Sequence, residues 1–588
     1  MSTSNPAQMP KNITLTQRLK KYLPIMNWLP NYSRADVTGD LIAGIIVTVM
    51  LVPQGMAYAL LAELPAQVGL YASIIPLFIY GLLGTSRTLA VGPVAIVSLM
   101  VASGIGQFAP QSLSETLLLA VTLAAMVGSI QLILGILRAG FIVNFLSHPV
   151  LSGFTSAAAI VIGLSQLKNL MGFDVPRSQQ LHETAWYVFT NMSLMNVASF
   201  AIGVGGILIL LYFKFGLGKH LAYLSLPKNV IVPLTKTGPL VIVVIGTLLV
   251  WGMGLNTSAD VSIVGTVPAG LPPFTMPTLE LETLQALFPI ALTISLVGYM
   301  EGISVAKALA SKRREKVDPN QELIAIGTSN IASALTGGYP IAGGFGRSMV
   351  NFTSGARTGL ASVITAVLLL FSVLFLTPLF TYLPNAILAA IIIVAVANLI
   401  DVKTAIHTWH YSKAEFLSLA ITFVAVLELG IETGILIGVA TSLILYLYRT
   451  SRPHVAVIGR IGTSEEYRNV LRYETTMQPN ILALRIDESL YFPNATYLEQ
   501  VVGNAVADNP ELEHFVLVCS AVNFIDTSAL EVLENLNDTL TENGISFNMA
   551  GVKGPVMDRL RKIGFDTHIG QENFYLNCHE ACESLATE

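Results

Sequence analysis

The chain has 588 residues, of which 53% are hydrophobic and 12% are charged, and its formal net charge is −5. Soluble domains carry about 25% charged residues, so this composition excludes a wholly soluble protein, and it equally excludes a disordered, collagen-like or coiled-coil chain. A negative net charge and a pI of about 6.0 argue against a nucleic-acid partner. What remains is a polytopic membrane protein with a soluble part.

Long apolar segments with short polar breaks fill the chain from Asp36 to Arg449. A spanning helix needs about 20 apolar residues. Segments near that length lie at 38–60, 66–84, 114–137, 145–167, 193–214, 238–254, 285–309, 361–380, 384–400, 414–429 and 432–448, and shorter or broken ones lie at 90–104, 322–336 and 341–354. They predict roughly fourteen crossings.

Basic residues predict the orientation of these crossings. Lys and Arg cluster before residue 35, in 214–236, in 311–318 and near 403, 413 and 449–452, whereas the 255–284 loop has none. Fourteen crossings place every cluster on one side, which the positive-inside rule assigns to the cytoplasm. We therefore predict cytoplasmic termini, an N-terminal arm at 1–37, a membrane domain at 38–450, a linker at 451–470 and a soluble domain at 471–588.

Two short segments interrupt the apolar pattern, one in each half of the membrane region. Thr88–Ser98 contains Gly92-Pro93, and Gly337–Ser348 contains Gly343-Gly344-Phe345-Gly346-Arg347. Paired, Gly/Pro-interrupted short segments indicate the midplane site of a secondary transporter. A helix that starts inside the membrane exposes unpaired N–H groups and a positive dipole end, which attract an anion. The alternative is a pair of glycine-packed helix interfaces.

Arg347 favours the functional interpretation, because an arginine inside the membrane is costly and usually marks a site. Its structural alternative is to snorkel, or to pair with Glu301. Glu301 lies in a long apolar helix, where burial disfavours the charged carboxylate, so it is a candidate proton-coupling residue or a fixed counter-ion of Arg347. Gln54 is either a donor to a substrate oxygen or an interhelical hydrogen bond.

The three cysteines, Cys519, Cys578 and Cys582, all lie near the C-terminus. An odd, clustered set is no disulfide framework. Cys578, His579 and Cys582 lack a second pair of ligands at a suitable spacing, so we interpret the cysteines as ordinary thiols and predict no metal or cofactor.

Several blocks resemble the SulP family of anion permeases. They are Pro53-Gln54-Gly55-Met56-Ala57-Tyr58-Ala59, Ala66-Gln67-Val68-Gly69-Leu70-Tyr71-Ala72-Ser73, Gly84-Thr85-Ser86-Arg87 and Asn320-Gln321-Glu322-Leu323. The resemblance implies an α-helical fold of two inverted repeats of seven segments, a core domain moving against a gate domain, and a homodimer. It also implies an anion held between the third and tenth segments by Gln54, Tyr58, Val91, Gly92, Val94, Ala95, Gly344, Phe345, Gly346 and Arg347.

The same resemblance bears on coupling. Sodium-coupled bicarbonate members have an Asp at the position of Glu301, with threonines where this chain has Val305 and Phe345. Sodium prefers oxygen ligands, and two of these oxygens are missing. We therefore expect proton coupling or exchange rather than sodium coupling.

The residues after 470 predict alternating strands and helices. Strands are expected at Ile481–Ile486, Phe515–Cys519 and Ser546–Ala550, and helices at 494–506, 527–541 and 554–563. The pattern resembles a STAS domain. The turn before Ser528 resembles the phosphorylated turn of bacterial anti-sigma antagonists, so Ser528 is a candidate phosphorylation site, although Asp526 or Thr527 in the same turn more simply caps the next helix.

The sequence thus predicts a secondary active transporter and no enzyme. We expect sulfate:proton symport by alternating access in a bacterial inner membrane, with lipid around the helices and a cytoplasmic protein partner at the STAS domain. Bicarbonate and four-carbon dicarboxylates are alternative substrates. An anion sensor signalling through the STAS domain and an anion channel are alternative functions. The chain has no Gly-x-x-x-x-Gly-Lys-Ser/Thr motif, which argues against an ATP-driven pump.

Overall fold

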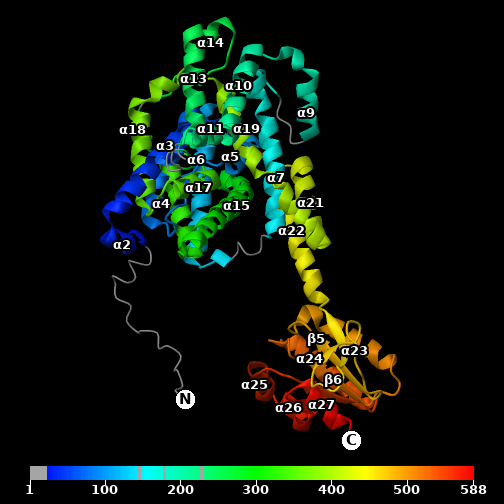
Figure 1. Ribbon diagram of the computed structural model, residues 1–588. Coiled ribbons are helices and arrows are strands. Elements are labelled where there is room, and N and C mark those ends of the chain that lie inside the picture. Colours follow the sequence, from blue (N-terminus) through cyan, green and yellow to red (C-terminus); the bar gives the residue numbers. More distant parts are fainter. Residues whose placement is uncertain are drawn as a thin grey trace. The chain divides into compact units, whose positions relative to one another are not determined.

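The computed structural model describes residues 23–141, 147–175, 181–225, 231, 234–268 and 270–587. The chain forms two compact units, Met1–Ala440 and Thr441–Glu588 (Figure 1). Each unit is described by itself below. Most of the predicted N-terminal arm, residues 1–22, lies outside the described residues.

Each of the fourteen predicted segments corresponds to a helix. These helices are α3 (Arg34–Leu61), α4 (Ala66–Leu83), α5 (Ala95–Gly106), α6 (Leu113–Ile136), α7 (His148–Ser165), α10 (Val197–Phe215), α13 (Gly238–Met253), α15 (Leu281–Arg313), α16 (Pro319–Leu335), α17 (Phe345–Thr353), α18 (Leu360–Phe375), α19 (Asn385–Val396), α21 (Lys413–Leu429) and α22 (Ile431–Ser451). Among the described residues, eight helices are long and apolar enough to cross a membrane, and α5, α13 and α18 are shorter apolar helices.

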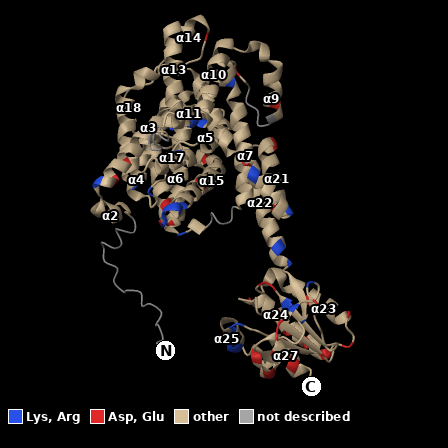
Figure 2. Ribbon diagram, in the orientation of Figure 1, with Lys and Arg blue, Asp and Glu red and all other residues tan. Residues whose placement is uncertain are grey.

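Short helices connect these segments. They are α2 (Ile25–Trp28), η1 (Leu29–Asn31), α8 (Leu167–Met171), α9 (Leu181–Thr190), η3 (Met192–Leu194), α11 (Leu217–Tyr223), α14 (Leu255–Ser258), η4 (Thr377–Phe380), η5 (Ala397–Leu399) and α20 (Val402–Tyr411). The predicted segment 361–380 is longer than α18, because Pro378 lies in the separate turn η4 and cannot continue an α-helix. Figure 2 shows few charged residues along the helices of this unit, as expected for helices that face lipid.

The long helices fall into two packing groups. In one, α16 packs against α4 and α6, α18 packs against α3 and α4, and α15 packs against α6. In the other, α10 packs against α13 and α19, and α7 packs against α19 and α21. The two groups meet where α3 contacts α13 and α19 and where α5 contacts α7. This division agrees with the core and gate domains implied by the sequence.

A short antiparallel strand pair joins the two halves of the first group. In β1 (Val91–Gly92) and β2 (Ala342–Gly343), Val91 lies opposite Gly343 and Gly92 opposite Ala342. Helices α5 and α17 begin directly after these strands. Because antiparallel strands approach from opposite directions, the two helices start beside the same strand pair and run away from it, as inverted repeats require.

The second unit is a six-stranded sheet with helices on both faces. Its strands are β3 (Val455–Arg460), β4 (Tyr467–Asn469), β5 (Ile481–Ile486), β6 (His514–Val518), β7 (Ser546–Ala550) and β8 (Phe574–Tyr575), in the order β4-β3-β5-β6-β7-β8. Strands β5 to β8 are parallel, and β3 is antiparallel to both neighbours. The helices are α23 (Phe492–Ala507), α24 (Thr527–Glu542), α25 (Gly554–Lys562), α26 (Phe565–Ile569), α27 (Cys578–Leu585) and the turn η6 (Gln571–Asn573).

Alternating side chains of the central strands build two separate cores. Leu484, Leu517 and Met549 lie in one core with residues of α23 and α24, and Ala483 and Val518 lie in the other core with residues of α27. The predicted linker at 451–470 is wrong, because β3 and β4 lie within it. Ala456 and Ile458 of β3 are buried, so this segment is part of the folded sheet. A short strand of this kind is stable only beside its partner strand, and it carries little signal of its own.

Candidate anion-binding site

The starts of α5 and α17 are the central feature of the site. Among the described residues, no side chain caps either helix: the N-cap residues are Val94 and Gly344. The first backbone N–H groups of an uncapped helix have no intrahelical acceptor and carry the positive end of the dipole. Two such ends beside one strand pair form a concentrated set of anion donors.

Gly92 of β1 has a backbone conformation that requires glycine. Its φ of +144° lies in a region that residues with a Cβ rarely adopt. A Cβ at Gly92 would lie 3.5 Å from Nη2 of Arg347, which is an ordinary van der Waals contact. The guanidinium therefore lies close to β1, and the backbone conformation, not the space beside Arg347, requires glycine here.

Arg347 lies in the first turn of α17 and is only 3% exposed. Its Nη1 donates to the carbonyl oxygen of Pro93 at 2.5 Å, while Nε and Nη2 have no hydrogen-bond partner among the described residues. Leaving a buried charged donor unpaired is costly. The guanidinium is thus held in place by one nitrogen and has two donors for an oxyanion.

Helix α3 carries two of the predicted polar site residues. Gln54 is 8% exposed and Tyr58 is 7% exposed. Neither side chain makes a hydrogen bond within the part of the chain that the structure describes, and Tyr58 interacts electrostatically with Arg347 and Glu301. The interhelical hydrogen bond considered for Gln54 is therefore not formed, and its amide is available to a ligand.

Glu301 of α15 is near Arg347 but not bonded to it. The two side chains interact electrostatically. Within the described residues they form no ion pair at 4.0 Å or less, and Oε2 of Glu301 is buried without a hydrogen-bond partner. A direct ion pair, the structural alternative for both residues, is absent here.

The remaining predicted residues surround this group unequally. Val91, Gly92, Val94, Ala95 and Gly344 are buried, whereas Phe345 is 51% exposed and Gly346 has no atom within 4 Å of the place its Cβ would take. The start of α17 is therefore open on the side of Phe345 and Gly346.

Two site residues were not singled out from the sequence. Ser98 of α5 and Tyr339 before β2 join their hydroxyl groups at 2.9 Å, and Tyr339 interacts electrostatically with Arg347. Both lie inside the two interrupted segments, so polar residues among glycines were the available signal. Their pairing links the two segments one turn below the helix starts.

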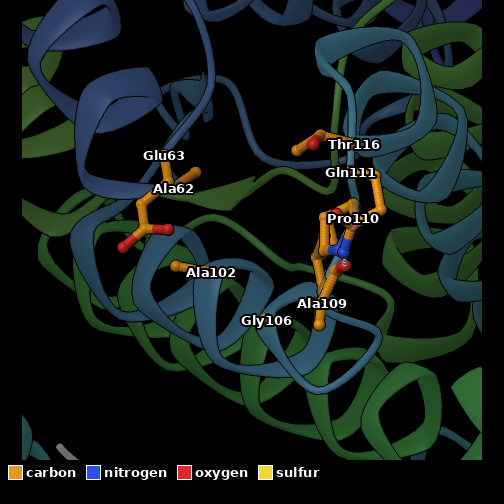
Figure 3. Close-up of a pocket in the computed structure, with 9 residues that line it drawn as sticks. Ala62, Glu63, Ala102, Gly106, Ala109, Pro110, Gln111 and Thr116 are labelled. Atoms are coloured by element: carbon orange, nitrogen blue, oxygen red, sulfur yellow. Dashed lines mark hydrogen bonds between the residues drawn. The ribbon is translucent and has the colours of Figure 1, made fainter. Parts of the chain in front are cut away.

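A cavity of about 420 Å³ lies elsewhere in this unit (Figure 3). It is lined by residues at the ends of α3 and α5, before α6 and in the first turn of α6, with Glu63 and Thr116 on opposite sides. Helix α5 has 12 residues and is therefore about 18 Å long. The cavity adjoins its C-terminal end, so it is separate from the predicted site at its N-terminal end.

In the second unit, the turn before α24 is built around Asp526. Its Oδ1 accepts from the backbone N–H of Ala529 at 2.9 Å and its Oδ2 from that of Phe492 at 2.8 Å. Asp526 is thus the N-cap of α24, as the simpler interpretation expects. Ser528 is exposed in the first turn of this helix.

The cysteines lie in the same unit and are all buried. Cys578 and Cys582 have their sulfur atoms 3.9 Å apart on one face of α27. Burial raises the pKa of the Cys519 thiol to about 12, which keeps it protonated and unreactive.

Comparison with known proteins identifies the family. The model of the sulfate permease family matches residues 37–422, and that of the STAS domain matches residues 472–581. The chain belongs to the sulfate permease family. Among its relatives, "Probable sulfate transporter 4.2" of Arabidopsis thaliana is 36% identical, over 97% of this chain and 85% of the relative. "High affinity sulfate transporter 2" of Stylosanthes hamata is 32% identical, over 96% and 86%.

Solved structures agree with this permease fold. The murine anion transporter Slc26a9 in its inward-facing state superimposes with a TM-score of 0.90 at 24% identity, covering 99% of this chain and 97% of that one. The transmembrane domain of the cyanobacterial bicarbonate transporter BicA has a TM-score of 0.58 at 23% identity, covering 70% and 98%. These likenesses show that this permease has the fold of a membrane transporter with a C-terminal STAS domain.

Proposed function

We propose that this permease is a secondary active transporter of sulfate, coupled to protons and working by alternating access. The observation that carries the proposal is a buried Arg347 at the uncapped start of α17, together with Gln54 and Tyr58 of α3, all of which have side-chain donors left without a partner within the described part of the chain. The names of the plant relatives support sulfate as the substrate.

The chemistry of the donors suits a tetrahedral oxyanion. Arg347 offers Nε and Nη2, the edge of a guanidinium that binds two oxygens of one anion. The remaining oxygens would face backbone N–H groups of the two helix starts and the Gln54 amide. Bicarbonate is the second candidate, because planar oxyanions also fit such donors, and the likeness to BicA concerns the fold alone.

Glu301 is the proposed coupling residue. One buried oxygen lacks a partner, and the Arg347 guanidinium is near it but not paired with it. Protonation of Glu301 would remove a negative charge close to the anion, so a proton and an anion favour each other's binding. Sulfate that enters with protons can be concentrated by an inward proton gradient.

Several predictions from the sequence belong to the same proposal. They are cytoplasmic termini, a homodimer, a protein partner at the STAS domain and phosphorylation of the exposed Ser528. A bacterial inner membrane also stays a prediction, since the relatives named above are plant proteins.

Uptake into proteoliposomes tests the proposal. Labelled sulfate, bicarbonate and succinate are offered with an inward proton gradient to the wild type, Arg347→Ala and Glu301→Gln. We expect gradient-dependent accumulation of sulfate by the wild type and none by Arg347→Ala. Glu301→Gln should exchange sulfate without accumulating it. Uptake that never exceeds equilibrium would identify a channel, and binding without uptake would identify a sensor.

A further inference from the structure

Helix α16 holds the segment that leads into β1. The carboxylate of Glu322, which is fully buried, accepts four hydrogen bonds from that segment and from α4. The donors are the Tyr80 hydroxyl at 2.7 Å, the Thr85 backbone N–H at 2.7 Å, the Thr85 hydroxyl at 2.5 Å and the Ser86 backbone N–H at 3.0 Å. Four donors fill the acceptor capacity of one carboxylate.

The same helix also holds the segment that leads into β2. Asn330 receives the backbone N–H of Ile341 at 2.7 Å and donates to the carbonyl of Ile341 at 3.1 Å. The Asn330 amide thus takes the place of a neighbouring strand. One turn later, Ser333 donates to the carbonyl of Tyr339 at 2.8 Å.

Helix α16 is itself fixed against α6. A Cβ on Gly128 of α6 would lie 2.6 Å from the carbonyl oxygen of Gly327, so the two backbones touch. The buried Gln131 of α6 accepts a hydrogen bond from Asn330 at 3.0 Å and donates to the carbonyl of Ser295 in α15 at 3.1 Å. Both segments are therefore bonded to a support that is held on two sides.

The supported segments lead directly to the site. The backbone N–H of Ala90 donates to the Ser348 hydroxyl at 2.9 Å, and that of Gly344 donates to the carbonyl of Ala90 at 3.1 Å. Asn351 of α17 donates to the carbonyl of Thr88 at 3.1 Å. A displacement at Thr85 or Ile341 would thus be transmitted to the starts of α5 and α17.

We propose that Glu322 and Asn330 are positioning residues for the anion site, and that α16 sets the spacing of the two helix starts. Neither side chain touches Arg347; each acts through the backbone of the segment that it holds. The inference rests on the proposed anion site. The spacing set by α16 determines which oxyanion the donors fit, so both affinity and selectivity depend on it.

Two near-isosteric substitutions test this role. Glu322→Gln replaces an acceptor oxygen by a donor amide that faces the N–H groups of Thr85 and Ser86. Asn330→Asp places an oxygen against the carbonyl of Ile341. The matched control is Ser329→Ala. Ser329 is buried on the same helix, and within the described ranges its hydroxyl bonds only to the carbonyl of Ala325 of its own helix, at 2.7 Å.

The measurement is equilibrium binding and uptake of labelled sulfate by the purified full-length protein, with selenate as competitor. We expect the KM for sulfate to rise about tenfold in both variants. A tenfold change corresponds to the free energy of one good buried hydrogen bond. The ratio of sulfate to selenate affinity should change as well. Ser329→Ala should keep wild-type values. A role confined to folding would lower the amount of active protein and leave KM and the ratio unchanged.

Hydrogen exchange locates the change. Glu322→Gln should increase exchange at residues 85–92, and Asn330→Asp at 339–344. If either variant cannot be purified, two milder substitutions replace them, with the same expected direction. Thr85→Val removes the hydroxyl that donates to Glu322 and accepts from the Asp318 backbone N–H, and Ser333→Ala removes the hydroxyl that donates to the carbonyl of Tyr339. Variants that bind sulfate with wild-type KM and selectivity overturn the positioning inference. A wild type that neither binds nor transports any anion overturns the proposed function instead.

Discussion

Two polar regions of the helical unit have opposite hydrogen-bonding states. At the start of α16, the Glu322 carboxylate has four donors and lies fully buried. At the starts of α5 and α17, Arg347 has two unpaired nitrogens and Glu301 one unpaired oxygen within the described residues. Buried polar groups are normally paired. The first region therefore has the character of a support, and the second has the unpaired donors and acceptor on which the proposed function rests.

The largest expected effect comes from changing Arg347 to lysine. Lys keeps the charge but loses the planar edge and the contact with the carbonyl of Pro93, so two directed donors are lost. We expect kcat/KM for sulfate uptake to fall about a hundredfold, because two hydrogen bonds to a charged group are lost. Arg357→Lys is the control, since that side chain is 55% exposed. Near-wild-type uptake by Arg347→Lys would show that charge alone suffices.

Substitutions of the two buried glutamates should differ most in their effect on the free energy of unfolding. Glu322→Gln breaks a saturated buried carboxylate and should lower the free energy of unfolding by about 3 kcal/mol. Among the described residues no donor bonds to Glu301, so Glu301→Gln deprives no donor of its acceptor and should change the free energy of unfolding by less than about 1 kcal/mol. Thermal unfolding of the purified full-length protein measures both. Equal losses in the two variants would contradict the distinction between support and site.

A methyl group at Gly344 should disturb the site without touching the support. A Cβ there would lie 2.8 Å from Nη2 and 2.9 Å from Cζ of Arg347, so the guanidinium must move. We expect Gly344→Ala to weaken sulfate binding about tenfold. Gly163→Ala of α7 is the matched control, because nothing lies within 4 Å of its Cβ position. The prediction fails if both variants bind sulfate equally well.

The smallest change in stability is expected when Asp487, a paired carboxylate at the surface of the second unit, is replaced. Burial alone would raise the pKa of Asp487, but hydrogen bonds from Arg485 and His454 outweigh it and hold the pKa below its ordinary value. The resulting stability is present above the pKa of the unfolded chain and is lost as pH falls through the lower folded pKa.

On acidification below about pH 4, the amides of β3 and β5 in the wild type should become less protected from hydrogen exchange. Asp487→Asn should make this loss of protection smaller. Hydrogen exchange of the full chain, corrected for intrinsic rates, measures it. Because the Asp487 side chain is 29% exposed, whereas Glu322 is fully buried, the change should be far smaller than for Glu322. If Asp487→Asn changed stability as much as Glu322→Gln does, burial would not explain the difference between the two carboxylates.

Much of the helical unit could be predicted because a membrane-spanning helix needs a long apolar segment, and a charged residue or a break in such a segment is energetically costly. The interrupted segments and Arg347 stood out for this reason, and the structure brings Tyr58, Glu301 and Arg347 into one group. The role of Glu322 could not be predicted, because the sequence marked it only as part of the Asn320-Gln321-Glu322-Leu323 motif and not by its partners. Its partners, Tyr80 and Thr85, are more than 230 positions away.

The sequence by itself determined the number and order of the apolar helices, the two breaks and the alternating pattern of β5, β6 and β7. These features follow from local periodicity and from the cost of charge in lipid. Only the tertiary structure decided that β1 pairs with β2, that Pro93 holds Arg347, that α16 supports both breaks, and that β3 and β4 belong to the sheet. Such contacts join residues far apart in the chain, and their energy exists only once both partners are in place.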